Sequence, residues 1–475
     1  METAIIDTTL LTMRDDRLGI IEDGALGIEG NELAYVGPND EFDPTDAEEV
    51  IDGSGSITMP GLINGHMHTR HTIVRGGAQD VPEIEWMNKA VGPLTNHVTG
   101  EDRIVSSRLG VIESLQAGAT TFVEYAGEVA ELVDTVYLPF GARVVATETI
   151  NEVPDDRADL GPRDLYPFDR SKGEAALDRA NALFEDYDDE PLVSAMYGAH
   201  AMDMLSAELL ETIKAEALER DSRIHMHVAQ GGREQLQIEE RYGESETTVS
   251  VLEDLDMLGE FLIAAHCHGT SPEERERMVA AGVNMAGCPS SIGMIDGIVP
   301  PVHHFTSLGG LACIGTDQAP GPGHHNMFRE ARTASLLSKV DHTDPTALPA
   351  WKALRLATIE GATVLNLDDR VGSLEEGKRA DVITVDVEQA NMTPVVSEPL
   401  KTYVPNLIYS TTGHEVSNVF IDGNAILRQG EFVDIDAEGI VEEANDRAKR
   451  VFADAEADWR AAGSELVDRV DEGWL

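Results

Sequence analysis

The chain has 475 residues, and its 87 acidic and 35 basic side chains give a formal net charge of −52. Hydrophobic residues make up 42% of the chain, an ordinary share for a globular protein. No basic stripe is present that would bind nucleic acid, and no apolar run approaches the roughly 18 residues of a membrane span. Composition and charge therefore argue against a nucleic-acid partner and against a membrane protein.

The acidic residues are spread along the whole chain, whereas an acidic binding surface would be local. At molar salt the screening length falls to about 3 Å, so self-repulsion of this size becomes tolerable, and we expect a halophilic protein. No basic segment followed by a long apolar one opens the chain, and Cys267, Cys288 and Cys313 form no CxxC pair. These features predict a cytoplasmic location.

Residues 1–56 alternate short β-type runs with Gly, Asp and Asn turns, which predicts antiparallel strands. From residue 57, eight apolar β-rich runs are separated by segments of helical period, which is typical of a parallel sheet. Eight strands over roughly 260 residues match the size of a (β/α)8 barrel. The first run is SITMPGLINGHMH, and the others lie at 120–125, 142–150, 191–200, 223–230, 261–269, 283–291 and 311–320.

Beyond the eighth run, helical segments lead back to the β pattern of the N-terminus. We therefore predict an α/β fold with a TIM-type (β/α)8 barrel at 57–370. The two chain ends, 1–56 and 371–435, are expected to form a small β-sandwich domain. Residues 436–475 have the period of an amphipathic helix, which could cover the barrel or a partner subunit.

Most of the predicted barrel strands begin apolar and end in polar side chains. In a barrel the carboxyl ends of the strands share one face, where active sites lie. Side chains at i and i+2 of a strand point to the same side, so His66 and His68 can both face the interior. The polar residues at or near these strand ends are His66, His68, His200, His225, His227, Gln230, His266, His268 and Asp317.

A single histidine at a strand end is more often a structural residue than a metal ligand. A His-x-His pair followed by further strand-terminal His, His and Asp residues favours a metal site instead. Three imidazoles and a carboxylate suit a catalytic Zn²⁺ with one open position, and Fe²⁺ or Mn²⁺ can use the same ligands. The predicted ligands of one divalent ion are His66, His68, His227 and Asp317.

Several segments together resemble the metal-dependent amidohydrolase superfamily, in the subgroup of triazine hydrolases, methylthioadenosine/S-adenosylhomocysteine deaminases and guanine deaminase. The segments are PGLINGHMHTRHTIVRGG, GAHAMDMLS, IHMHVAQ, AAHCHGTS, CPSSIGMIDGIVPPV, IGTDQAP and ATIEGATVLNLDDRVGSLEEGKRADVITVD. The resemblance covers nearly the whole chain. It implies a barrel with a small β-sandwich built from both chain ends, and it makes a homodimer plausible.

The resemblance also implies roles for single residues. His66, His68, His227 and Asp317 match the metal ligands of the family. His266 matches a histidine that approaches the water or the substrate, His200 a position that often touches substrate, and Trp86 an aromatic side chain over the bound ring. We expect Asp317 to take a proton from water and return it to the leaving group, while His266 stabilises the developing charge.

One residue departs from the family pattern. Related ring deaminases have glutamate three residues after the fifth-strand histidine, but this chain reads HVAQ, with Gln230 in that place. An amide can donate or accept a hydrogen bond but cannot relay a proton at neutral pH. Either another group transfers the proton, with His71 and His325 as candidates, or the substrate does not need the transfer. Gln230 itself could serve only to orient the substrate.

The sequence thus predicts a zinc-dependent hydrolase that acts on a small molecule at a carbon–nitrogen bond other than a peptide bond. The first hypothesis is hydrolytic deamination of a purine, pterin, pyrimidine or triazine, which releases ammonia. The second is hydrolysis of a cyclic amide or of a C–Cl bond, in which the leaving chloride needs no proton. The third is a metal-binding barrel without catalytic activity.

Overall fold

The computed structural model describes residues 1–154, 160–161 and 163–475. Its central feature is a curled parallel sheet. Each of the eight predicted runs overlaps one of its strands, and the eighth run overlaps two, β13 and β14. The strands are β6 (Leu62–His68), β7 (Ala119–Ala126), β8 (Arg143–Ile150), β9 (Val193–Ala201), β10 (Ile224–Val228), β11 (Leu262–His266), β12 (Asn284–Gly287), β13 (Ala312–Ile314) and β14 (Asp317–Gln318). The predicted TIM-type barrel is therefore confirmed.

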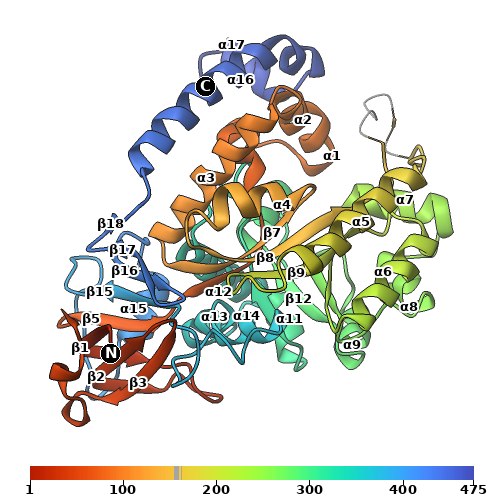
Figure 1. Cartoon of the computed structure of the whole chain (residues 1–475). Coiled ribbons are helices and arrows are strands. Elements are labelled where there is room, and N and C mark those ends of the chain that lie inside the picture. The colour runs from red at the N-terminus through yellow and green to blue at the C-terminus, as the bar shows by residue number, and fades with distance from the viewer. Residues whose placement is uncertain (155–159, 162) are drawn as a thin grey trace.

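The barrel closes between its first and last strands. β13 pairs with β12, and β14, which follows two residues later, pairs with β6. The described helices around the sheet (Figure 1) include α3 (Gly100–Gln116), α5 (Arg170–Asp186), α6 (Ala207–Glu219), α7 (Gly232–Tyr242), α8 (Thr248–Asp254), α9 (Pro272–Ala280), α10 (Pro289–Ile295), α11 (Val302–Ser307) and α12 (Met327–Asp341). Closure brings residues about 250 positions apart in the sequence onto neighbouring strands.

Alternating side chains fill the two sides of the barrel wall. Val123, Val145 and Ile263 lie in the inner cluster, which Ala362 and Val364 of α14 (Ile359–Val364) complete. Side chains of opposite parity pack against the outer helices; they include Phe122, Val144, Met226 and Leu262. The barrel is thus a filled core whose open end lies at the strand carboxyl termini.

Strands from both chain ends form a second, mixed sheet, as the prediction of a β structure built from both ends requires. Its order is β18-β17-β16-β15-β5-β1-β2-β3, with β4 paired to β1. The bounds are β1 (Thr3–Leu11), β2 (Ile20–Glu29), β3 (Glu32–Pro38), β4 (Glu49–Asp52), β5 (Ser56–Pro60), β15 (Val382–Asp386), β16 (Val416–Ile421), β17 (Asn424–Arg428) and β18 (Glu431–Phe432). β5 pairs directly with β15, from Ser56 to Pro60, so strands from the two chain ends belong to one continuous sheet.

The C-terminal tail forms α16 (Ala437–Ala462) and α17 (Glu465–Asp471), as its amphipathic pattern predicts. α16 lies across α3 and α2 (Gly92–Thr95), where Val451 and Ala455 share a cluster with Leu94 (Figure 1). Leu466 of α17 joins the cluster around Trp86. The tail therefore packs behind the loop that follows β6.

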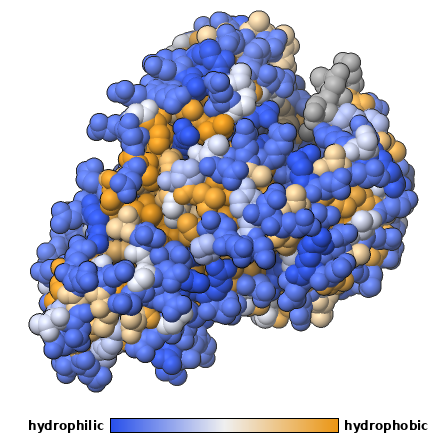
Figure 2. All heavy atoms as spheres, viewed as in Figure 1, coloured by the Kyte–Doolittle hydropathy of each residue, from blue (hydrophilic) through white to orange (hydrophobic). Residues whose placement is uncertain are grey.

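Two further observations concern the surface. In the described residues no helix is long and apolar enough to cross a membrane. Figure 2 shows mainly hydrophilic residues over the visible face, with hydrophobic residues gathered between the C-terminal helices and the barrel.

Candidate active site

Cavity and predicted residues

A cavity of about 240 Å³ opens at the carboxyl ends of the barrel strands. Eight of the ten predicted site residues line it, together with the loops after β6, β10 and β12. Its lining comprises His68, His71, Glu83, Trp86, Met87, His200, Met204, His227, Gln230, Arg233, Glu234, His266, Ile292, Ile295, Asp296, Asp317 and Gln318. The geometry thus brings most of the predicted set to one place.

Two predicted residues lie outside this lining. His66 is fully buried at the base of the site. His325 is also fully buried, with its Nδ1 3.0 Å from Thr316 Oγ1 and its Nε2 3.2 Å from Thr72 Oγ1. His325 therefore joins the loop after β6 to the segment before Asp317, rather than facing the cavity.

A bulge in β6 directs the His-x-His pair inward. Ile63 faces the inner cluster, and strict alternation would turn His66 outward. The pairing of β6 with β7 shifts register between Asn64 and Met67, so Met67 packs in the outer core. His66 and His68 consequently face the site, which is a common effect of a bulge beside an active site.

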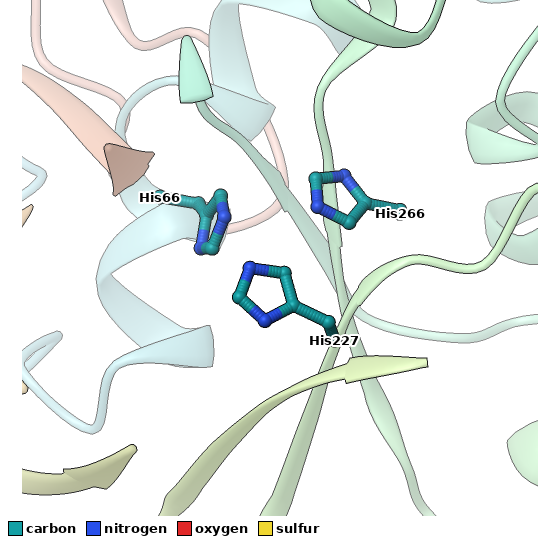
Figure 3. A group of neighbouring side chains, drawn as sticks. All are labelled: His66, His227 and His266. Atoms are coloured by element: carbon teal, nitrogen blue, oxygen red, sulfur yellow. The ribbon is translucent and has the colours of Figure 1, made fainter. Parts of the chain in front are cut away.

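A left-handed backbone conformation orients the side chains of two further residues. His266 has φ 70° and Asp317 has φ 58°, a conformation that costs free energy for side chains other than glycine. Ala265 faces the inner cluster, so plain alternation would point His266 outward. The left-handed turn instead places its ring 5.2 Å from those of His66 and His227, and Figure 3 shows the three imidazoles pointing toward one another.

Metal-ligand geometry

Two overlapping groups of side chains could hold a metal ion. One is His66, His227 and His266, and the other is His66, His68 and Asp317. Within each group the ligand atoms lie within 4.8 Å of one another. His66 belongs to both groups, so the four predicted ligands surround one small volume, with His266 beside it.

Hydrogen bonds to the outer ring nitrogens fix the imidazoles. The Nδ1 of His68 lies 2.7 Å from the Tyr125 carbonyl oxygen, and that of His227 lies 2.7 Å from the His200 carbonyl oxygen. The Nδ1 of His66 lies 3.0 Å from His225 Nε2. Each arrangement leaves Nε2 for a cation, which is the usual way in which surrounding groups orient metal-binding histidines.

The electrostatics also fit a cation. Burial first, and then neighbouring histidines, hold the pKa of His66 well below its ordinary value, and the same causes lower the pKa of His227 to about 3. Both imidazoles are therefore neutral near pH 7 and can donate lone pairs. Asp317 is held by a 2.5 Å hydrogen bond from Ser291 Oγ. Neutral imidazoles and a fixed carboxylate make a suitable donor set for a divalent ion.

Residues that the sequence did not point to

Four charged residues of the cavity were not predicted from the sequence: Glu83, Arg233, Glu234 and Asp296. Glu83 stands three residues before Trp86, and Asp296 lies within the segment CPSSIGMIDGIVPPV. Both lie in stretches already singled out, but their loops carry no periodicity that would indicate where the side chains point. Glu234 accepts hydrogen bonds from the backbone N–H groups of Ala229 and Gln230, which fixes the turn after β10.

Comparison with known proteins

The sequence model of the amidohydrolase family matches residues 57–426, so the chain belongs to that family. It is 32% identical to the 5-methylthioadenosine/S-adenosylhomocysteine deaminase of Desulforudis audaxviator, over 90% of this chain and 95% of that protein. It is 30% identical to the 5'-deoxyadenosine deaminase of Methanosarcina acetivorans, over 96% of this chain and 100% of that protein. The family predicted from the sequence is confirmed.

Solved structures agree with this assignment. An adenosine deaminase from Xanthomonas campestris with bound zinc superimposes with a TM-score of 0.86 and 26% identity, covering 95% of this chain and 99% of that one. The zinc complex of an atrazine chlorohydrolase from Arthrobacter aurescens has a TM-score of 0.80 at 22% identity, over 94% and 100% of the chains. The second comparison supports the fold alone.

Predictions from the site geometry

Gly315 allows the last barrel strand to approach His66. A Cβ at this position would lie 2.4 Å from the His66 backbone nitrogen. We expect Gly315→Ala to displace His66 and to weaken metal binding about 10–100-fold, as changes beside metal ligands commonly do. Chelator competition measures this affinity. Gly100→Ala is the control, since nothing lies within 4 Å of its Cβ position; equal affinity of both variants would contradict the prediction.

Glu330 predicts a pH-dependent stability. Burial raises the pKa of its carboxyl from 4.5 to about 8, while its Oε1 accepts a 2.8 Å hydrogen bond from the Ser290 N–H. Between these two pH values Glu330 is protonated in the folded state and ionised in the unfolded state. The contribution of Glu330 to the free energy of unfolding therefore falls as pH rises toward 8. Glu330→Gln removes this titration.

Denaturant unfolding measures the effect of Glu330→Gln. The free energy of unfolding of the variant, relative to the wild type, should rise between about pH 5 and about pH 8, because only the wild type carries a glutamate that stays protonated when folded and releases its proton on unfolding in this range. Taking the difference cancels groups that titrate equally in both proteins. The same difference at both pH values would contradict the prediction.

Proposed function

We propose that this chain is a metal-dependent hydrolytic deaminase that removes the exocyclic amino group of an adenine-containing nucleoside. The observation that carries the proposal is the group His66, His68 and Asp317, whose ligand atoms lie within 4.8 Å of one another beside the cavity. Family membership supports the hydrolytic class, and the names of several relatives support the substrate class.

The cofactor in this proposal is one divalent ion, with Zn²⁺ as the first choice and Fe²⁺ or Mn²⁺ as alternatives. His66, His68, His227 and Asp317 would hold it. When bound, such an ion supplies Lewis-acid chemistry and lowers the pKa of water from 15.7 toward about 7. The neutral state of the buried imidazoles supports this assignment.

The remaining steps belong to the side chains of the chain itself. Asp317 accepts a proton from the attacking water and delivers it to the departing amine, while His266 donates a hydrogen bond to the oxygen that becomes negative. Trp86, which is 4% exposed and anchored by a 2.9 Å bond from Nε1 to the Ala78 carbonyl oxygen, provides an apolar wall for the ring. His200 and His71 complete the substrate contacts.

An ammonia-release screen tests this function. We expect release from adenosine, 5'-deoxyadenosine, methylthioadenosine or S-adenosylhomocysteine, with little from pterins, pyrimidines or triazines. Asp317→Asn should lower the rate by about 10²–10⁴-fold, because it removes the proton carrier. Release of chloride from a chlorotriazine, or of a carboxylic acid from a cyclic amide, without ammonia from any nucleoside would contradict the proposal.

We further propose that the protein is salt-adapted and cytoplasmic, and that it can form a homodimer. The net charge of −52 supports the first point, because repulsion among so many acidic groups is weakened only by screening ions. The free energy of unfolding, measured by denaturant titration, should rise as KCl is increased from about 0.1 M to molar concentrations. Stability that falls or stays constant over this range would contradict salt adaptation.

A further inference from the structure

Hydrolytic deamination of an adenine-type ring requires a proton on a ring nitrogen while water adds to the neighbouring carbon that carries the amino group. This requirement rests on the proposed function. Gln230 stands where the related deaminases have glutamate, and its amide has no proton to transfer at neutral pH. Another group that lines the cavity must then supply the proton.

Three candidates are poorly placed for this work. His325 lies between Thr72 and Thr316, outside the cavity lining. Glu234 already accepts hydrogen bonds from the N–H groups of Ala229 and Gln230 and from Thr248 Oγ1. Burial lowers the pKa of His71 to about 4, so its imidazole carries no spare proton at neutral pH.

Glu83 and Asp296 approach the residue after Gln230 from two different loops. Glu83 opens α1 (Glu83–Glu85), and Asp296 ends α10. From the point where a Cβ on Gly231 would stand, Glu83 Oε1 is 3.2 Å away and Asp296 Oδ1 is 3.5 Å away. Both carboxyl groups line the cavity together with Gln230 and Asp317. They therefore converge beside Gly231, the residue that follows Gln230.

The surroundings of Glu83 favour a proton on its carboxyl group. Burial raises the pKa of Glu83, and the charge of Asp296 raises it further, while Arg233 and His268 act in the opposite direction. The His268 side chain is 1% exposed, with Nε2 3.4 Å from Asp296 Oδ1. Neither ring nitrogen of His268 has a hydrogen-bond partner among the described residues. Two neighbouring carboxyl groups commonly retain one proton between them.

We propose that Glu83 and Asp296 form a proton-sharing pair that protonates the substrate ring nitrogen in place of the glutamate that Gln230 replaces. The proton leaves the pair as the carbon–oxygen bond forms. When the carbon–nitrogen bond breaks and ammonia departs, the hydroxyl proton of the tetrahedral adduct returns to the pair. The product then carries a carbonyl and a ring N–H, and no other reactant is consumed.

Glu83→Gln and Asp296→Asn test the pair, with Glu85→Gln as the matched control. Glu85 lies in the same loop, pairs with Lys89 at 2.7 Å and does not line the cavity. Each test variant should lower kcat by about 10²–10⁴-fold with KM and bound metal nearly unchanged. The control should keep the wild-type kcat. A raised KM with kcat preserved would assign Glu83 to substrate binding and overturn the proposal.

A second-site change sharpens the test. Adding Gln230→Glu to Glu83→Gln places a carboxyl where the amide stands and should recover most of the lost kcat. A folded, metal-loaded double variant that remains as slow as Glu83→Gln alone would contradict the proposal.

Infrared difference titration reads the shared proton without turnover. Above the usual titration range of glutamate, the wild type should show a carboxylic acid band that Glu83→Gln and Asp296→Asn both lack, while the band of Glu330, whose pKa burial raises to about 8, stays in all three proteins. Absence of this difference would overturn the pair even if ammonia is released. Its presence in a protein that releases no ammonia would support the pair and refute the proposed function.

Discussion

The site depends on closure of the barrel between β6 and β14. Asp317 pairs with Met67 across this seam, which brings its carboxylate to 3.4 Å from His68 Nε2 and 3.8 Å from His66 Nε2. Asn64 and Thr316 reinforce the seam with two hydrogen bonds, of 2.8 and 3.0 Å. Sheet closure and ligand assembly are therefore one event, and a metal ion would add binding energy to the folded state at this seam.

Local departures from regular strand geometry direct the functional side chains. The bulge in β6 turns His66 inward, and left-handed backbone redirects His266 and Asp317. Such conformations persist only where the surrounding structure enforces them, and here barrel packing and the bond from Ser291 do so. Several irregular positions in these strands thus contribute side chains to the site.

The periodic pattern of the sequence predicted the strands of the barrel. The eight apolar runs overlap these strands, and strand-end residues such as His227 and Asp317 meet at one face because parallel strands end together. His66, His266 and Asp317 were predicted site residues, but periodicity could not show how irregular backbone turns their side chains toward the site. The direction of His266 follows from a φ angle, and Glu83 lies in a loop that is anchored three residues later, where Trp86 shares a cluster with Leu466 of α17. Nor could alternation alone show that β5 and β15 pair, because pairing partners are set by tertiary contacts.

Under the proposed account, the predicted metal ligands keep their places while Glu83 and Asp296 carry out the proton transfer that the Gln230 amide cannot perform. The predicted ligands lie at the ends of barrel strands, whereas Glu83 begins the short helix α1 and Asp296 directly follows α10, both outside the strands. A change of proton carrier therefore leaves the metal geometry intact.

The central claim is that His66, His68, His227 and Asp317 bind one divalent ion. Elemental analysis of protein purified without chelators, combined with anomalous diffraction at the absorption edge of the metal, measures this directly. The account predicts about one ion per chain, bonded to these four side chains. Protein that is folded and active without a bound divalent ion, or an ion located elsewhere, would contradict it.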